Sequence, residues 1–293
     1  MTAKIVVIAG VTAASKTAAA IALAKRRDGE LVGADSVQVY RGFDIGSAKP
    51  TVEELDGVPH HLLDVVDPDE PIDAGRYAEL ADAAIADVIA RGKLPVVVGG
   101  TGLWLGALVR GLVALPRPEP ALRAALEAKA DEVGAPAMHA HLTTVDPGYA
   151  AKIHPNDRRR ILRALEVLEQ TGRPLGELQA EHAKGSPRYR TETYLLDRPR
   201  ADLHLAIRAR IEAMLAAGWV DEVRALLERW GPDCRPMQSV GYRQIAEHLL
   251  EGVPIEEAAQ RAYKATRIYT RRQRTWFRGE PLGGTWTEAE RVP

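Results

Sequence analysis

A phosphate-binding loop is the clearest chemical signal in this sequence of 293 residues. The segment GVTAASKT at 10–17 matches the pattern G-x-x-x-x-G-K-[ST] at seven of eight positions. In such loops backbone N–H groups and the lysine bind phosphate oxygens, and the following hydroxyl reaches Mg²⁺. Ser15 occupies the second glycine position, where a missing Cβ normally lets the backbone approach phosphate. The segment predicts an anion site with an altered loop; the alternative is an ordinary turn with a surface lysine.

Two further segments offer polar groups beside that loop. Asp35 lies in GADSVQVY at 33–40, and Thr101 lies in GGTG at 99–102; each segment follows a short apolar run. Open parallel sheets bind ligands at the carboxyl ends of their strands. Asp35 is therefore a candidate site acid, although an Asp-Ser pair can also cap a helix. The glycines around Thr101 fit either a close backbone approach to a ligand or a plain turn.

A basic helical face lies near the C-terminal end. Seven cations and no acid occur from Arg261 to Arg278, so the rest of the chain carries −8 against a total of −1. Six of them recur every three or four residues, which places them on one face of a helix: Arg261, Lys264, Arg267, Arg271, Arg274 and Arg278. A stripe of one sign with aromatic residues between the cations favours contact with a nucleic acid. The alternative is a merely solvated face.

Alternating strands and helices must position these groups. Short apolar runs predict parallel strands over 4–9, 31–34 and 93–98, with helices over 16–25 and 74–91 between them. This alternation predicts an α/β fold with a parallel sheet. Farther along, a strand is predicted over 193–196, and helices over 157–171, 202–217, 220–230, 241–251 and 255–275.

The order of the predicted strands and helices divides the chain into four parts. The Pro-rich segment at 115–120 is a plausible hinge. We expect the first part of the α/β core at 1–115, a helical insertion domain at 116–190, a return to the core with C-terminal helices at 191–280, and a loose tail at 281–293.

Composition excludes several classes of protein. Apolar residues make up 46% and charged residues 27%, as in globular chains. No apolar run approaches the roughly 20 residues of a membrane helix, and MTAKIVVIAG is unlike a signal peptide. A single cysteine, Cys234, excludes a disulfide scaffold, and the histidines lack zinc-site spacings. We therefore expect a cytoplasmic protein without a membrane partner, in which any metal is Mg²⁺ bound with phosphate.

Taken together, these segments resemble the tRNA dimethylallyltransferase family, also called tRNA isopentenyltransferases. The resemblance spans about residues 4–280 and rests on ordered stretches: GVTAASKT (10–17), GADSVQVYRGFDIGSAKP (33–50), VPHHLLDVVDP (58–68), GGTGLW (99–104), HPNDRRRILRALEVLEQTG (154–172), QSVGYR (238–243) and ATRIYTRRQRTWFR (265–278). It implies a P-loop NTPase-like core. It also implies transfer of a dimethylallyl group from its diphosphate to N6 of the adenosine 3′ of the anticodon in tRNA.

The resemblance implies roles residue by residue. Asp35, Thr101 and Arg210 would be catalytic, with Asp35 accepting the N6 proton. The diphosphate would be bound by Gly10, Thr12, Ala13, Ala14, Ser15, Lys16 and Thr17, with Mg²⁺ on Thr17. The tRNA would contact Asp35, Ser36, Val37, Gln38, Thr101, Arg123, Arg159, Arg160, Arg163, Gln238, Gly241, Tyr242, Arg243, Arg267, Arg271 and Arg274. The insertion domain would close over the anticodon stem, and a monomer is the family expectation.

This sequence departs from the family on the diphosphate side. The loop usually reads GPTASGKT, so Val11, Ala14 and Ser15 are unusual. Ala206 stands where a second arginine usually precedes Arg210 by four residues, and Arg208 is a possible substitute on another helix face. We expect weakened donor binding. The alternatives are a tRNA-binding protein that has lost transfer activity, a prenyltransferase acting on a free adenine nucleotide, and a small-molecule kinase.

Overall fold

The computed structural model describes residues 3–279 and 282–293 and divides the chain into two compact units. The larger unit comprises Met1–Gly111 and Pro187–Pro293, and the smaller unit comprises Leu112–Ser186. The smaller unit therefore begins and ends four residues before the insertion domain expected at 116–190. Among the described residues, no helix has both the length and the apolarity needed to cross a membrane.

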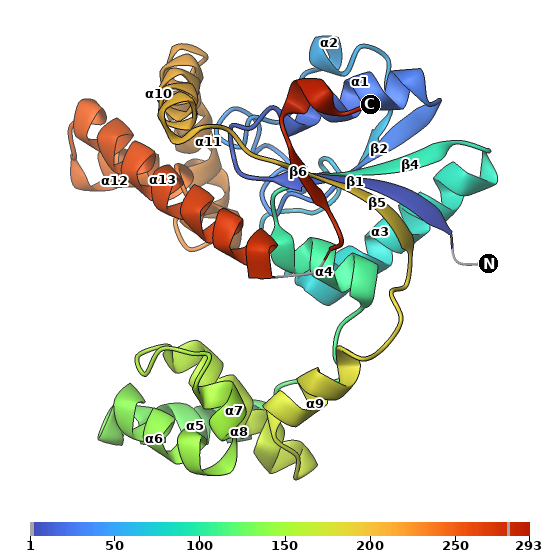
Figure 1. Cartoon of the computed structure of the whole chain (residues 1–293). Coiled ribbons are helices and arrows are strands. Elements are labelled where there is room, and N and C mark those ends of the chain that lie inside the picture. The colour runs from blue at the N-terminus through green and yellow to red at the C-terminus, as the bar shows by residue number, and fades with distance from the viewer. Residues whose placement is uncertain (1–2, 280–281) are drawn as a thin grey trace. The chain divides into compact units, whose positions relative to one another are not determined.

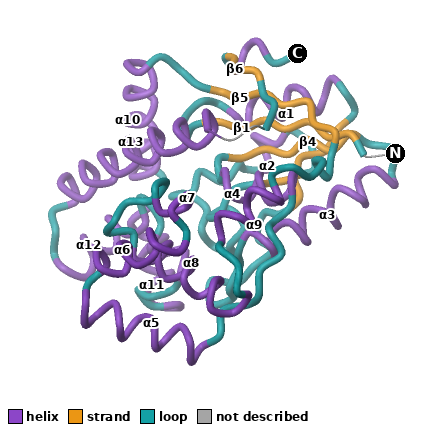
Figure 2. The backbone as a smooth tube through the Cα atoms, turned by 60° about the horizontal axis from the view of Figure 1, so that its bottom comes forward, coloured by secondary structure: helices purple, strands orange, loops and turns teal. Residues whose placement is uncertain are grey.

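A six-stranded sheet forms the centre of the larger unit (Figures 1 and 2). All strand pairs are parallel, in the order β3-β2-β4-β1-β5-β6. The strands are β1 Lys4–Gly10, β2 Gly29–Gly33, β3 His60–His61, β4 Leu94–Gly99, β5 Arg190–Leu196 and β6 Thr285–Thr287. The sequence predicted β1, β2, β4 and β5, whereas β3 and β6 are new. Because β6 pairs with β5, the expectation of a loose tail is wrong for Thr285–Thr287, while residue 281 lies outside the described residues.

The sheet is buried, as its β-branched sequence predicts. Ile5 to Ile8 in β1 are fully inaccessible to solvent, which fits a parallel strand covered on both faces. The helices in the N-terminal segment of the larger unit, up to Gly111, are α1 Lys16–Arg26, the short α2 Val52–Leu55, α3 Ala74–Ala90 and α4 Gly102–Arg110. At the carboxyl ends the backbones approach very closely: a Cβ on Gly10 would lie 2.1 Å from the Leu196 carbonyl oxygen, and Gly10 has φ +138°. Only glycine fits this position, from which the phosphate loop leaves the sheet.

Four helices complete the larger unit near the sheet. They are α10 Arg200–Ala216, α11 Trp219–Trp230, α12 Tyr242–Glu251 and α13 Ile255–Gly279, with short 3₁₀ turns at Arg235–Gln238 and Ala289–Arg291. All four helices follow the predicted periodicity. The long α13 packs on α10 and α12 and also contacts β1 and α4 (Figure 1). The same helix that bears the basic stripe therefore also places side chains at the carboxyl edge of the sheet.

The smaller unit is helical and has its own core. Its helices are α5 Pro120–Val133, α6 Ala135–Val145, α7 Pro147–Ala150, α8 Arg158–Thr171 and α9 Leu175–His182. Leu126, Met138, Leu142 and Ile161 are among the buried residues that hold these helices together. A separate apolar core of this kind is what a compact unit needs to fold as a body.

Candidate active site

Two adjoining cavities of the larger unit meet at the carboxyl edge of the sheet. The loop cavity, about 370 Å³, is lined by the phosphate loop and includes Lys16 and Thr17. The helix cavity, about 310 Å³, is lined by residues of α10 and α13, by the segment 238–242 that leads into α12, and by the loops at 35–37 and 46–47. Four residues line both cavities: Thr12, Asp35, Ser47 and Arg210. A ligand in one cavity therefore meets a ligand in the other beside a carboxylate and a guanidinium.

The phosphate loop has the conformation that presents amides to an anion. Ala13 and Ser15 adopt left-handed backbone angles, with φ 65° and 56°, whereas Ala14 between them does not. Such alternation turns successive N–H groups to one side. The Nζ of Lys16 donates to the Val11 carbonyl oxygen at 2.8 Å. Burial lowers the pKa of Lys16 to about 8; the Asp35 carboxylate opposes this shift and Arg210 adds to it. A bound anion would favour the charged lysine.

The structure separates the predicted diphosphate residues into two groups. Thr12, Ala13, Ser15, Lys16 and Thr17 line the loop cavity. Gly10 and Ala14 are not among its lining residues. The backbone of Gly10 lies against Leu196, and Ala14 is 1% exposed, so both pack into the core beneath the loop. Their direct contact with diphosphate is a prediction that the geometry does not favour.

Two of the three residues that differ from the family's usual phosphate loop are buried in the core. Val11 is 0% exposed and Ala14 is 1% exposed, so both changes alter the core under the loop. Ser15 alone faces the loop cavity. Arg208 does not take the place of the arginine missing at Ala206, because its guanidinium lies 5.1 Å from the centre of the Tyr263 ring.

Asp35 follows β2 and is held in a turn. Its Oδ1 accepts hydrogen bonds from the amides of Val37 at 2.9 Å and Gln38 at 3.3 Å. No helix begins at this point, so the alternative that Asp35 caps a helix is wrong; the carboxylate caps a turn. Since both bonds end on Oδ1, the other oxygen can accept a proton from a ligand.

Thr101 lies just after β4 and binds the residues on either side of Asp35. Its Oγ1 accepts from the Ser36 amide at 3.0 Å, and its own amide donates to the Ala34 carbonyl oxygen at 3.2 Å. Thr101 is not among the residues that line either cavity. Its geometry therefore supports a role in fixing the Asp35 turn more than direct contact with the diphosphate.

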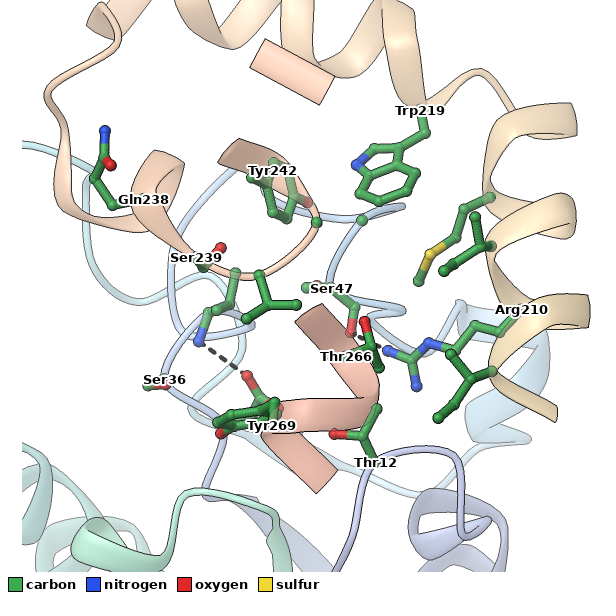
Figure 3. Close-up of a pocket in the computed structure, with 18 residues that line it drawn as sticks. Thr12, Ser36, Ser47, Arg210, Trp219, Gln238, Ser239, Tyr242, Thr266 and Tyr269 are labelled. Carbon is green, nitrogen blue, oxygen red and sulfur yellow. Dashed lines mark hydrogen bonds between the residues drawn. The ribbon is translucent and has the colours of Figure 1, made fainter. Parts of the chain in front are cut away.

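Two more groups surround the Asp35 carboxylate. The Nη2 of Arg210 donates to the Ser47 carbonyl oxygen at 3.0 Å (Figure 3). Burial lowers the pKa of the Arg210 guanidinium, and Asp35 opposes this shift. Burial and the nearby Asp35 carboxylate raise the pKa of Tyr269 to about 12, so this phenol stays protonated. Asp35 is thus close to the cationic groups of Lys16 and Arg210 and to the neutral Tyr269 phenol.

The helix cavity suits a flat or apolar ligand. Ile207, Ile211 and Met214 of α10 form an apolar wall. In Figure 3 the rings of Trp219 and Tyr242 lie on one side of the cavity, with Tyr269 on the other. The predicted tRNA residues that line this cavity are Asp35, Ser36, Val37, Gln238, Gly241 and Tyr242. Gln38 lines the loop cavity instead, and Arg243 is an exposed residue 3.7 Å from Glu247.

Gln273 is a site residue that the sequence reasoning missed. This buried side chain of α13 accepts hydrogen bonds from the Thr12 amide at 2.8 Å and the Thr12 hydroxyl at 3.1 Å. Its amide group donates to the Gly100 carbonyl oxygen at 2.9 Å. Gln273 therefore joins the phosphate loop to the loop that carries Thr101. Its helical spacing from the buried Thr270 and Phe277 is a signal that could have placed it on the inner face of the basic helix.

Glu222 on α11 was also missed, and it holds the loop that positions Arg210. Its carboxylate accepts from the amides of Asp44 at 3.1 Å, Ile45 at 2.6 Å and Gly46 at 3.1 Å, and from the Tyr242 hydroxyl at 2.7 Å. This loop leads directly to Ser47, whose carbonyl oxygen binds Arg210. One carboxylate thus fixes both a wall of the helix cavity and an arginine of the site.

We expect Glu222→Ala to lower the free energy of unfolding by about 3 kcal/mol, because four donors lose a charged acceptor. Urea unfolding measures this loss. Glu228→Ala, an exposed change on the same helix, is the matched control and should change stability by less than about 0.5 kcal/mol. A loss below about 1 kcal/mol for Glu222→Ala would mean that the loop does not depend on this carboxylate.

The basic stripe forms one side of a groove. Arg200 and His204 of α10 face Lys264, Arg267, Arg271 and Arg274 of α13 across a cavity of about 440 Å³, which we call the basic groove. Arg274 is paired with Asp197 through two hydrogen bonds of 2.6 and 2.7 Å, so its charge is largely matched inside the protein. Arg267 donates to the His204 Nε2 at 3.2 Å. Partial burial and the neighbouring Arg267 lower the pKa of His204.

The predicted tRNA contacts of the smaller unit differ in their exposure. Arg123 and Arg163 lie 3.7 and 2.7 Å from the carboxylate of Glu166, which is fully buried. These two arginines therefore neutralise a core acid. Arg159 and Arg160 are exposed on the first turn of α8, and Arg160 lies 3.5 Å from Asp157. The exposed pair is better placed to meet an external anion.

The site offers few protein ligands to a metal. Within residues 3–279 and 282–293, no group of three or more His, Cys, Asp or Glu side chains could hold a metal ion. Mg²⁺ is commonly bound by one or two protein oxygens together with waters and substrate phosphates. Thr17 and Asp35 both line the loop cavity, so the residues present fit a Mg²⁺ ion that arrives with a diphosphate.

The fold and the site define an α/β protein of the P-loop type, with a phosphate loop beside an acid at the carboxyl edge of its sheet. The chain belongs to the IPP transferase family, whose model matches residues 38–280. The recognition and the fold class predicted from the sequence are thereby confirmed.

Relatives and solved structures agree with this assignment. A tRNA dimethylallyltransferase of Anaeromyxobacter dehalogenans (strain 2CP-C) is 51% identical over 283 residues, covering 97% of this chain and 94% of the relative. The full-length tRNA isopentenylpyrophosphate transferase of Bacillus halodurans has a TM-score of 0.72 at 38% identity, covering 99% and 90% of the two chains. A eukaryotic dimethylallyltransferase acting on tRNA has a TM-score of 0.81 at 30% identity, covering 94% and 70%.

Proposed function

We propose that this chain transfers a dimethylallyl group from dimethylallyl diphosphate to N6 of the adenosine 3′ of the anticodon in tRNA and releases diphosphate. Membership of the IPP transferase family and the names of its relatives support this reaction. The observation that carries the proposal is the meeting of the loop cavity and the helix cavity at Asp35 and Arg210. Two reactants bound in these cavities would meet at that point.

The loop cavity is the proposed diphosphate site. The amides of Ala13 and of residues 15–17, the Lys16 ammonium and the Arg210 guanidinium would stabilise the negative charge that grows on the leaving diphosphate. Mg²⁺ bound to the diphosphate and to Thr17 would neutralise part of the same charge. As the bond from C1 to the diphosphate oxygen breaks, its electron pair leaves with the diphosphate. The apolar wall of α10 would hold the five-carbon group in the helix cavity.

Asp35 is the proposed general base. N6 of adenine is a poor nucleophile because its lone pair is delocalised into the ring, so removal of a proton helps as the N6–C1 bond forms. The proton would go to the Asp35 oxygen that the turn leaves available. The adenosine must leave its stack to enter the cavity, which costs a few kcal/mol. Contacts with Trp219, Tyr242 and Tyr269 would offset that cost.

The basic groove and the exposed arginines of α8 are the proposed sites for tRNA phosphates. Arg267 and Arg271 matter most in the groove, because Arg274 is already paired with Asp197. One chain supplies every group named here, so we propose that it acts as a monomer. Because the proposed substrate is tRNA, we assign the reaction to the cytoplasm.

Neutralising Arg267 and Arg271 together should weaken RNA binding and flatten its dependence on salt. Each lost phosphate contact lowers the slope of log K against log salt by about 0.7 for a single strand and about 0.9 for a duplex, so the double change to glutamine should lower it by about 1.4 to 1.8. Titrating an anticodon stem-loop at several salt concentrations measures the slope. Arg224→Gln, on the exposed face of α11, should leave the slope unchanged. If the double variant had the same slope as the unsubstituted protein, the groove would be a solvated surface that does not bind RNA phosphates.

Transfer itself is tested with an unmodified anticodon stem-loop, Mg²⁺ and labelled dimethylallyl diphosphate. We expect label in the RNA at the adenosine 3′ of the anticodon. Tight RNA binding without label would favour the second candidate, a tRNA-binding protein without transfer activity, which the changes at Ser15 and Ala206 make worth testing. Label entering AMP at comparable efficiency would instead indicate a free nucleotide as acceptor.

A further inference from the structure

Ser15 has a conformation that glycine adopts far more readily. It is the N-cap of α1, with φ 56° and ψ 32°, in the left-handed region. Residues with a Cβ rarely occupy this region unless neighbouring contacts hold them there. Ser15 makes no side-chain capping hydrogen bond to α1, which is what serine commonly does at an N-cap. Something other than the helix must therefore hold this residue.

Arg198 supplies that contact. Its Nη2 donates to the Ser15 Oγ at 2.6 Å, across 183 positions of the chain. Charged donors make the stronger hydrogen bonds in proteins. The backbone of Arg198 is anchored as well, because its amide donates to the Asp197 Oδ1 at 2.8 Å, and that carboxylate is paired with Arg274 of α13. Arg198 therefore connects the ion pair between Asp197 and Arg274 to Ser15 of the phosphate loop.

We propose that Arg198 is a positioning residue that holds the phosphate loop in its anion-binding conformation through Ser15. This inference rests on the proposed function, because it assumes that the loop binds the donor's diphosphate. The Ser15 amide and those after it point usefully only while Ser15 stays left-handed. Glycine at this position would adopt the same angles without help. The hydrogen bond from Arg198 thus stabilises in serine the left-handed conformation that glycine adopts unaided.

The proposal predicts that the two residues depend on each other. Arg198→Met should weaken binding of dimethylallyl diphosphate with Mg²⁺ about tenfold, which is the scale of one charged hydrogen bond. In the Ser15→Gly background the same change should have less than a twofold effect, because glycine no longer needs the contact. Calorimetric titration of the four proteins without RNA measures this cycle. Affinity for the anticodon stem-loop should stay within twofold throughout, and Arg224→Met is the matched surface control.

Three outcomes would overturn the inference. Equal losses from Arg198→Met in both backgrounds would mean that the arginine acts through its own charge and not through Ser15. No loss in either background would mean that the contact does not matter for the loop. A fall in RNA affinity together with donor affinity would indicate a general structural role. A wild-type chain that does not bind the donor at all would instead refute the proposed function.

Discussion

Replacing Asp35 with asparagine is expected to lower kcat about 10²- to 10⁴-fold while leaving affinity for the anticodon stem-loop within a factor of about two. Asparagine keeps an oxygen that can accept from the amides of Val37 and Gln38, so the turn should survive. What it lacks is the ability to take a proton from N6. Single-turnover transfer with saturating donor separates this chemical step from binding.

Two further variants sharpen this test. Asp35→Ala should abolish turnover as well, and it should loosen the turn because both amides lose their acceptor. Asp87→Asn, an exposed change on α3, should leave transfer unaffected. If Asp35→Asn or Asp35→Ala retained more than about a tenth of the activity, Asp35 would not be the base, since general bases typically contribute far more.

Replacing Lys16 with methionine is expected to lower kcat/KM for the donor about 10²- to 10³-fold, the usual cost of removing one group that stabilises developing charge. Methionine has a side chain of similar length and packing, so the fall in kcat/KM measures the contribution of the ammonium charge. Lys25→Met, an exposed change in the last turn of the same helix, is the matched control. A loss of less than about fivefold for Lys16→Met would mean that another cation carries the diphosphate charge.

The lowered pKa of Lys16 gives this test a second readout. In the free protein the ammonium loses its proton near pH 8, so kcat/KM for the donor should fall as pH rises through about 8. Stability should change in the opposite direction. The pKa of Lys16 in the folded protein lies below the ordinary lysine value of 10.5, so the buried charge lowers the free energy of unfolding below about pH 8. That loss of stability disappears as the pH rises from about 8 to 10.5. A fall at the same pH in the residual activity of Lys16→Met would assign the titration to another group.

Local sequence patterns were enough to predict the sheet edge that carries the site. Apolar β-branched runs predicted β1, β2 and β4, and the polar groups that follow them, the phosphate loop, Asp35 and Thr101, come together because parallel strands end at one edge. β3 and β6 escaped prediction because strands of two and three residues are too short to show periodicity. They form through pairing with longer neighbours.

Contacts between distant segments could not be read from the sequence. Helical spacing placed Arg274 on the basic face, yet it could not reveal that Asp197, 77 positions earlier, neutralises it. Gln273 and Glu222 hold loops that lie far from them in the chain. The unusual residues Val11 and Ala14 looked like losses from a phosphate site, but burial shows that they belong to the core beneath it. Each of these outcomes depends on tertiary packing.

The proposed mechanism needs one crevice that holds both reactants, with Asp35 beside the acceptor and Lys16 beside the leaving group. A crystal structure with an anticodon stem-loop and a slowly reacting thiolo analogue of dimethylallyl diphosphate tests it most directly. We expect both ligands in one complex, the diphosphate in the loop cavity, and N6 about 2.6–3.2 Å from the Asp35 carboxylate. An acceptor base bound away from Asp35, or two ligands that exclude each other, would show that transfer does not take place in this crevice.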